Sequence, residues 1–472
     1  MNVVKGGAPE ETPGGGDTLE DPHTLDDLLG SLQGAGQWDS RGSFTLAGRK
    51  AAGKLAKSLL PEPSDWILKV VQAACQGGAP ELRISQTNRA THIAFRLSYT
   101  LDLRDLESSL TRAVASGQPG VDDLSTALRV VGLGQERAWV ARLRTAEQQH
   151  WVLVDQGMVS LETSDQPDGP EDATEVLLGI AFPPGESGKV GGLVRFGAAI
   201  QNEHEALTQR TRACPIPLWL DGERMDTLRR SSSLVGFERE VFLGVTTGSG
   251  STASPIRFPG GVEESQVQRL GARLDDADPF HLPDPEQRRE GSSLLRVAFR
   301  YNSERHPRER TARVFRPLPT PSRVLLVRHG VVVGKRNLGF SEPVAVDIYL
   351  NADGERSDLS GLEVEVLAQH VEQARRDLKG IGPFLGLLER KLAAHVCPPQ
   401  MLDMVATAGA SGVALLLAPW PVKLVTLGFS AWTLRNSALQ QQKVVDLCRL
   451  ELRSFQERYC QEQRADDSLT SE

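Results

Sequence analysis

The 472-residue sequence predicts an α+β protein with more than one domain. A helical period appears early, in "DWILKVVQAACQ", and runs that alternate apolar and polar residues follow, in "ELRISQTNRATHIAFRL" and "ATEVLLGIAF". Helices that precede strands, without a regular alternation, indicate a largely antiparallel sheet covered on one face. The length exceeds what one hydrophobic core usually supports, so we expect two or three domains.

Composition and charge favour a globular cytoplasmic protein. The chain is 39% hydrophobic and 24% charged, and its net charge of -8 argues against a general nucleic-acid partner, which needs a basic surface. Five cysteines form no C-x-x-C pair, so we expect reduced thiols and no metal site.

Four segments are expected from shifts in composition. Residues 1–24 are rich in Gly, Pro and acidic residues, lack an export signal and predict a disordered tail. Residues 25–230 form the first α+β domain, and residues 231–396 form a second. Residues 397–472 form an apolar hairpin followed by an amphipathic helix.

The first domain has a clear order of elements. A short amphipathic helix capped by Thr24 precedes a strand-like "SFTL" and a helix that stops at Pro61. The helix "DWILKVVQAAC" follows and ends at Gly77 and Gly78. The later elements are expected as a hairpin over 81–97, a helix over 101–117, paired strands over 137–145 and 149–163, a strand over 173–182, a helix over 202–213 and a strand with an Asp-Gly turn over 215–225.

The C-terminal third is predicted to be mainly helical. "LEVEVLAQHVEQARRDLKGIGPFLGLLERKLAAHV" predicts two helices that close the second domain. Met404 to Leu434 is apolar and rich in small residues, which suits either a buried helical hairpin or a membrane attachment. "QQQKVVDLCRLELRSFQERYCQEQ" predicts an amphipathic helix that could self-associate into a homo-oligomer or pack down.

The order of elements from about Phe44 to Arg224 resembles the N-terminal nucleotide-binding domain of the ninety-kilodalton heat-shock chaperones, in the GHKL superfamily that also includes gyrase, MutL and histidine kinases. "WILKVVQAACQGGAPELRI" is similar to the helix that carries a Glu-x-x-x-Asn box, and "IAFRLSYTLDLRDLESSL" to the segment that carries Asp-x-Gly-x-Gly. "LLVRHGVVVG" extends the resemblance weakly into the middle domain. The resemblance implies a Bergerat-type α/β sandwich.

The same resemblance implies ATP chemistry that the matching residues do not support. The Glu that activates water corresponds to Lys69, and a cation cannot accept a proton from water. The Asn that binds Mg²⁺ corresponds to Ala73, which has no side-chain oxygen. A shift of one residue places Gln72 at the metal position but Leu68 at the base position.

The second motif is altered in a similar way. The Asp that binds adenine corresponds to Arg96, and the two glycines correspond to Ser98 and Thr100. Thr174 keeps a residue type that the family uses to support the base. The phosphate lid has only "SGQPGVDD" and "VGLG" as candidates.

We therefore expect a pseudo-ATPase that acts by binding a protein partner or client, as a chaperone-like or scaffold protein. Gln72 and Thr174 are the candidate remnants of a cofactor site, with no catalytic residue, no metal and no bound cofactor. Two alternatives stay open: a divergent ATPase that uses ATP and Mg²⁺ through Gln72, and a membrane-attached adaptor. His329 lacks a partner nearby in sequence and is expected to be structural.

Overall fold

The chain is described from a computed structural model. It describes residues 56–460 except for 88–89, 113–116, 136, 156–157, 165–168, 171, 182–189, 229–237, 248–255, 258–289, 292, 306–312 and 396–419. The expected tail, the helix after Thr24 and the strand at Phe44 lie outside these residues, and so does the first part of the apolar run, from Met404 to Pro419, with no structural account. The described residues belong to one compact unit, Ala51–Glu472.

The first sheet contains eight strands in the order β5-β4-β3-β6-β2-β1-β7-β8. All neighbouring strands pair antiparallel except β1 and β7, which pair parallel. The strands are β1 (Leu82–Gln86), β2 (Ala90–Leu97), β3 (Ala138–Arg144), β4 (Gln149–Asp155), β5 (Met158–Ser164), β6 (Thr174–Ala181), β7 (Leu218–Leu220) and β8 (Glu223–Arg224).

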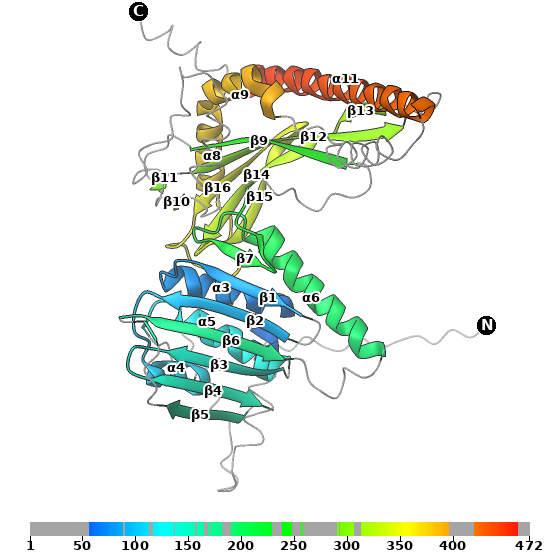
Figure 1. Cartoon of the computed structure of the whole chain (residues 1–472). Coiled ribbons are helices and arrows are strands. Elements are labelled where there is room, and N and C mark those ends of the chain that lie inside the picture. The colour runs from blue at the N-terminus through cyan, green and yellow to red at the C-terminus, as the bar shows by residue number, and fades with distance from the viewer. Residues whose placement is uncertain are drawn as a thin grey trace, which may run out of the picture. The chain divides into compact units, whose positions relative to one another are not determined.

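Helices cover one face of this sheet, and no helix of the described residues covers the other, which is called the open face below (Figure 1). Burial alternates along each strand because successive side chains point to opposite faces. In β1, for example, Leu82 and Ile84 are buried whereas Arg83 and Ser85 are exposed. The helices of this region are η1 (Pro63–Asp65), α3 (Trp66–Gln76), α4 (Leu103–Arg112), α5 (Val121–Arg129), the π-helical turn η2 (Val130–Gly134) and α6 (Val190–Arg210).

The helix α3 is central to this layer, and every residue from Trp66 to Cys75 is buried. Such complete burial explains why its sequence is apolar on most sides, beyond the single stripe of a surface helix. The Trp66 indole donates to Glu203 of α6 over 2.9 Å, and Arg137 pairs with the same carboxylate at 2.7 Å. A buried polar contact therefore ties α3 to α6.

Three hairpin predictions are confirmed. Strands β1 and β2 pair antiparallel, as do β3 and β4. The Asp221-Gly222 turn joins β7 to β8, and both residues have positive φ, 51° and 81°, as a two-residue hairpin turn requires. The α+β class is likewise confirmed, with a largely antiparallel sheet.

The first sheet ends at Arg224, and the second sheet begins at Glu238. It has six strands in the order β13-β12-β16-β14-β15, with β9 also paired to β12. Its strands are β9 (Glu238–Thr247), β12 (Leu294–Arg305), β13 (Arg313–Pro317), β14 (Thr320–Arg328), β15 (Val331–Glu342) and β16 (Val344–Asn351). The short strands β10 (Ile256–Arg257) and β11 (Glu290–Gly291) pair separately.

Within the described residues, three helices follow the second sheet. The two predicted helices are α8 (Ala368–Gly380) and α9 (Gly382–His395). The last helix, α11 (Trp420–Tyr459), is continuous for 40 residues, whereas we expected an apolar hairpin and then a separate helix. No Gly or Pro interrupts it between Gly428 and Tyr459, so nothing breaks the backbone hydrogen bonds at the expected boundary. Within the described part of the chain, no helix has the length and apolar character needed to cross a membrane.

Candidate functional site

The candidate site lies on the side of α3 that faces the start of α5. Lys69, Ala73 and Gln76 are three or four residues apart and therefore form one stripe of the helix. The Gln76 side chain accepts the amide of Gly120 at 2.8 Å. A Cβ added to Gly120 would come within 2.4 Å of the Ala73 carbonyl oxygen, and the φ of Gly120 is +82°. The stripe is thus a packing contact between two helices.

Lys69 is neutralised inside this contact. Its side chain is 5% exposed, and its Nζ lies 2.7 Å from Oδ1 of Asp123, near the start of α5. The same ammonium donates to Oε1 of Gln72 over 2.9 Å. Burial of an unpaired ammonium would cost several kcal/mol, so Asp123 is what allows a lysine at this position.

The Gln72 amide joins α3 to the second sheet and the segment after it. Its Nε2 lies 3.4 Å from the carbonyl oxygen of Arg328 and 3.3 Å from that of Gly361. A Cβ on Gly361 would be 2.7 Å from Lys69 Nζ, and the φ of Gly361 is +67°. The Gly361 backbone therefore lies directly against the Lys69 ammonium.

His329 completes the surroundings of the Lys69 contact. It lies in the turn between β14 and β15 with φ of 45°, and its amide donates to Oδ1 of Asp353 over 2.7 Å. Burial lowers the pKa of His329 despite the carboxylates of Asp353 and Asp123, which favour its charged form. The position of the ring in a structured turn agrees with the structural role that we expected.

These residues do not fit a magnesium nucleotide in the way that the sequence resemblance implies. Gln72 Oε1, the only amide oxygen that α3 offers at this point, already accepts from Lys69. A Mg²⁺ ion placed on that oxygen would lie beside the ammonium, and charges of +2 and +1 at about 4 Å repel by about 8 kcal/mol at an effective dielectric constant of about 20. Among the described residues, no group of three or more His, Cys, Asp or Glu side chains could hold a metal ion.

The residues that correspond to the Asp-x-Gly-x-Gly motif lie outside the Lys69 contact. Arg96 is exposed in β2 and points to the open face, away from the helices. The strand period of two turns Leu97, not Arg96, toward the helices. The Ser98 hydroxyl donates to the Gly77 carbonyl over 2.9 Å, which fastens the end of α3, and Thr100 is exposed.

Thr174 is completely buried at the start of β6, where it pairs with Leu97. Its Oγ1 accepts the amide of Leu101 over 2.8 Å, and it therefore holds the segment between β2 and α4. Gln72 and Thr174, the two candidate remnants of a pocket, thus serve different segments of the chain. We keep their role as remnants of a nucleotide site as a proposal only.

Asp123 is the functional residue of this contact that sequence reasoning missed. We considered "SGQPGVDD" only as a lid for phosphates. The two acidic residues at the first turn of α5, Asp122 and Asp123, were the available signal, because carboxylates favour helix N-termini. The pairing with Lys69, which lies 54 positions earlier, has no local signature.

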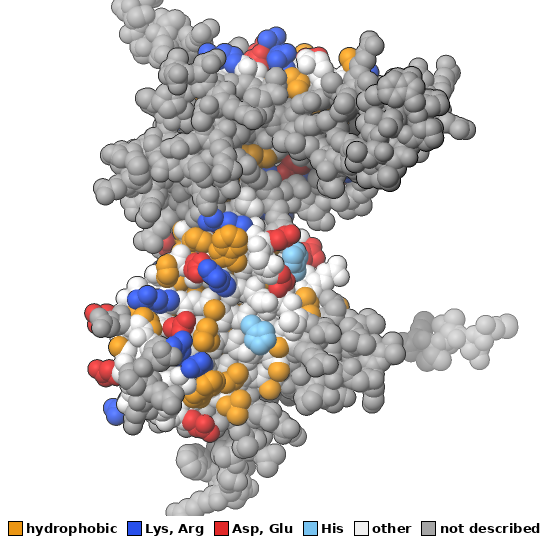
Figure 2. All heavy atoms as spheres, in the orientation of Figure 1, with side chains coloured by type: hydrophobic (Ala, Val, Ile, Leu, Met, Phe, Trp, Pro, Cys, Tyr) orange, Lys and Arg blue, Asp and Glu red, His pale blue; other side chains and the backbone are white. Residues whose placement is uncertain are grey.

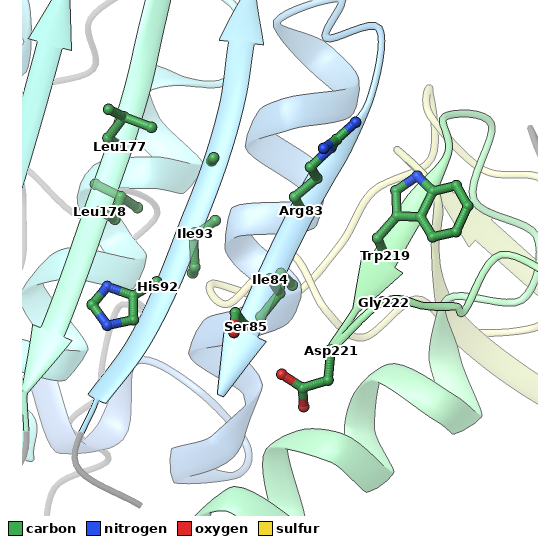
Figure 3. A pocket seen from close by; sticks show the side chains of 11 residues that line it. Arg83, Ile84, Ser85, His92, Ile93, Leu177, Leu178, Trp219, Asp221 and Gly222 are labelled. Atoms are coloured by element: carbon green, nitrogen blue, oxygen red, sulfur yellow. The ribbon is translucent and has the colours of Figure 1, made fainter. Parts of the chain in front are cut away.

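A separate hollow of about 900 Å³ lies on the open face of the first sheet. Figure 3 shows Arg83, His92, Leu177 and Trp219 on neighbouring strands around it. Hydrophobic side chains mix with arginines on this face in Figure 2. One row across the strands is His92, Gly179, Val140 and Leu153, and Leu153 is 45% exposed.

Comparisons with known proteins reveal similarity in fold. No family model and no curated protein matches the chain. The chain is similar to the ATPase domain of the mismatch repair endonuclease MutL from Aquifex aeolicus, at 10% identity, 67% coverage of this chain, 98% coverage of that chain and a TM-score of 0.32. For the B-subunit of DNA gyrase from Myxococcus xanthus the corresponding values are 8%, 69%, 89% and 0.34. For the ATPase region of Saccharomyces cerevisiae topoisomerase II they are 6%, 66%, 82% and 0.31.

None of these three structures is a heat-shock chaperone, so the finer resemblance to that family has no support from them. At such identities the likeness concerns the fold alone.

Proposed function

We propose that this chain is a nucleotide-independent binding protein, built on a GHKL-like fold, that acts as a scaffold for a protein partner. The observation that carries the proposal is the pairing of Lys69 with Asp123 and Gln72 on α3, 2.7 and 2.9 Å from the ammonium. A general base and a metal ligand would have to act at these positions in an ATPase of this kind. Here these positions instead form the contact of Lys69 with Asp123 and Gln72, in which the charges of Lys69 and Asp123 compensate each other.

The position of Gly361 and Arg328 supports the same proposal. Their carbonyl oxygens accept from Gln72, so the amide is held away from any ligand by backbone groups of the second region. Entry of a nucleotide would require these contacts and the Gly120 contact with Ala73 to break together. A role that needs no nucleotide is consistent with a site closed in this way.

The open face of the first sheet supports a binding role. It exposes Leu153 and surrounds the hollow beside Trp219 and Leu177, and no described helix covers it. Exposed apolar side chains grouped on one face are typical of protein contact surfaces. The partner would be a protein, consistent with the net charge of -8.

The nucleotide part is tested by isothermal titration with ATP and Mg²⁺ and by measurement of phosphate release from the full chain. We expect neither binding at micromolar concentration nor turnover. Phosphate release that is abolished in Gln72→Ala but kept in the exposed control Arg83→Gln would overturn the proposal and favour the divergent ATPase.

The partner part is tested by affinity capture with the wild type and two matched variants. Leu153→Glu changes the open face, and Leu450→Glu changes an exposed leucine of α11, which is 64% exposed. We expect a defined protein to be lost from the Leu153→Glu sample, kept in the Leu450→Glu sample, and bound again as a purified pair. Equal capture by all three proteins would argue against a contact surface on this face.

A further inference from the structure

A hollow of about 450 Å³ lies where the chain leaves α6 and meets β14, β15 and β16. It is distinct from the α3 contact and from the open face of the first sheet. Its charged lining residues are Arg210, Arg212, Arg323, Lys335, Asp347 and Glu363. The volume falls within the range of small-molecule sites, about 300–1,000 Å³.

Arg212 is the unusual member of this lining. It is 5% exposed, and its Nε donates to the Thr208 carbonyl at the end of α6 over 3.1 Å. Among the described residues, no carboxylate pairs with its guanidinium, and Arg212 lines the hollow. Burial lowers the pKa of Arg212, while the more distant charges of Glu240 and Asp347 oppose this effect.

The neighbouring carboxylates are engaged by other arginines. Arg296 pairs with Glu240 and, over 3.3 Å, with Asp347. Arg300 shares Glu240 at 2.7 Å, and Arg323 shares Asp347 at 2.7 Å. Among the described residues, Glu240 and Asp347 thus pair with other guanidinium groups, and neither pairs with Arg212.

The remaining charged lining residues do not pair with Arg212 either. Arg210 is already engaged, because it pairs with Asp65 at 3.4 Å and donates to the carbonyls of Val332 and Leu362. Lys335 and Glu363 are both exposed, and their charges are opposite. Arg212 therefore lines the hollow as a buried cation that no described carboxylate pairs with.

The wall beside Arg212 also offers a hydroxyl and an apolar surface. Tyr349 lines the hollow and is 1% exposed, and burial raises its pKa to about 12, so its hydroxyl keeps its proton. Leu325 and Val332 line the same hollow and supply apolar contact. A ligand with a charged head and a small organic body would match such a lining.

We propose that this hollow binds a small phosphorylated molecule, with its phosphoryl group on Arg212 and Arg323. A guanidinium presents paired donors that match the oxygens of a phosphate, and bidentate contacts of this kind are strong. A phosphate monoester carries about two negative charges at neutral pH, whereas a carboxylate carries one, so a phosphate attracts a buried guanidinium more strongly. The site needs no Mg²⁺, because the arginines themselves neutralise the phosphate.

The first experiment measures thermal unfolding of the full chain with inorganic phosphate as the probe, at constant ionic strength adjusted with chloride. We expect phosphate to raise Tm in a saturable manner and acetate to do so weakly or not at all. Affinity for phosphate should fall when the pH is lowered through about 6, where phosphate gains a proton, whereas affinity for sulfate should stay constant.

Substitution of Arg212 separates a ligand site from a structural role. Arg212→Gln should lower the affinity for phosphate tenfold or more and raise the Tm of the ligand-free protein, because it removes a buried, uncompensated charge. Arg212→Lys should keep part of the affinity, and Tyr349→Phe should lower it about three- to tenfold through loss of one donor. The matched control Arg83→Gln, on the open face, should change neither quantity.

Several results would overturn the proposal. A phosphate effect equal to that of chloride, or one that Arg212→Gln leaves intact, would remove the site. A lower Tm for ligand-free Arg212→Gln would show that Arg212 stabilises the fold by itself. Nucleotide binding is assigned to one of the two sites by the variants. A nucleotide that occupies this hollow binds without Mg²⁺ and loses affinity in Arg212→Gln but not in Gln72→Ala. This result is therefore distinct from the test of the α3 contact.

Discussion

Two buried charge clusters in the chain differ in how completely they are neutralised. At α3, one ammonium, that of Lys69, meets one carboxylate, that of Asp123, and Gln72 supplies the remaining oxygen. Beside α6, Glu240 and Asp347 pair with Arg296, Arg300 and Arg323, and Arg212 has no carboxylate partner among the described residues. The first cluster is thus neutral, and the second holds one buried cation that no described carboxylate pairs with.

The difference shows where a ligand is to be sought. A neutral buried pair holds two segments together, and an added ion would break it. A cluster with excess charge lowers the stability of the protein until an oppositely charged group enters. The sequence resemblance directs attention to the first cluster, whereas charge balance directs it to the second.

The largest effect on stability is expected when Lys69 of α3 loses its carboxylate partner. Asp123→Ala leaves the Lys69 ammonium buried without a partner, which should lower the free energy of unfolding by about 3–5 kcal/mol. Urea denaturation monitored by circular dichroism measures this change. The double variant Lys69→Met, Asp123→Ala removes both charges and should recover most of the loss. A double variant as unstable as Asp123→Ala would contradict the view that the pair is a replaceable structural contact.

A smaller effect is expected at Gly330, which adjoins both clusters. It follows His329, and a Cβ there would lie 2.8 Å from Cys75 Sγ and 3.1 Å from Cys214 Sγ, two residues after Arg212. With φ of +80° as well, Gly330→Ala should destabilise the protein by about 1–3 kcal/mol.

Gly339 offers the matched control for that change. Its φ is +92°, but a Cβ there would meet no atom within 4 Å. Gly339→Ala therefore reports the backbone strain alone, and Gly330→Ala should cost clearly more in the same urea experiment. Equal losses of unfolding free energy in the two variants would mean that the Cys75 and Cys214 thiols move aside without destabilising the protein.

The smallest effect concerns pH and sharpens the description of the α3 cluster. Burial lowers the pKa of His329 below its usual 6.5, so the unfolded chain binds a proton more readily than the folded chain. The contribution of His329 to the free energy of unfolding is complete above pH 6.5. It is lost as the pH falls from there through the pKa of His329 in the folded state. His329→Asn, which tolerates the positive φ, should reduce the loss of stability between neutral and mildly acidic pH.

An unchanged pH dependence in His329→Asn would assign the effect to other groups. The exposed His92 on the open face provides the control, because His92→Asn should leave the pH dependence of the wild type in place.

Local sequence patterns predicted most of the strands and helices, since they depend on neighbours in sequence. Alternation located β1, β2 and β6, and the Asp221-Gly222 pair located its turn. The same pattern could not show which of the two faces of a strand lies against the helices. Arg96, which corresponds to the family's adenine-binding Asp, lies on the open face, and Leu97 faces the helices.

The charge clusters could not be predicted because their members come from distant segments. Lys69 meets a carboxylate 54 positions away, and Arg296 shares Asp347 across 51 positions. No periodicity or motif joins Arg212 to Tyr349, whereas the substitutions at Lys69 and Ala73 were readable in a single helix. Sequence thus indicated what one element had lost, and only the packed structure showed what stood in its place.

The parallel pairing of β1 with β7 has a consequence for how the chain folds during synthesis. Leu82 pairs with Leu218, so the edge of β1 stays unpaired until more than a hundred further residues have emerged. Contacts across such long loops form slowly, and an unpaired strand edge can associate with other chains meanwhile. We expect nascent chains that end before β7 to aggregate or to recruit folding helpers, and chains that extend just beyond β8 to become resistant to protease.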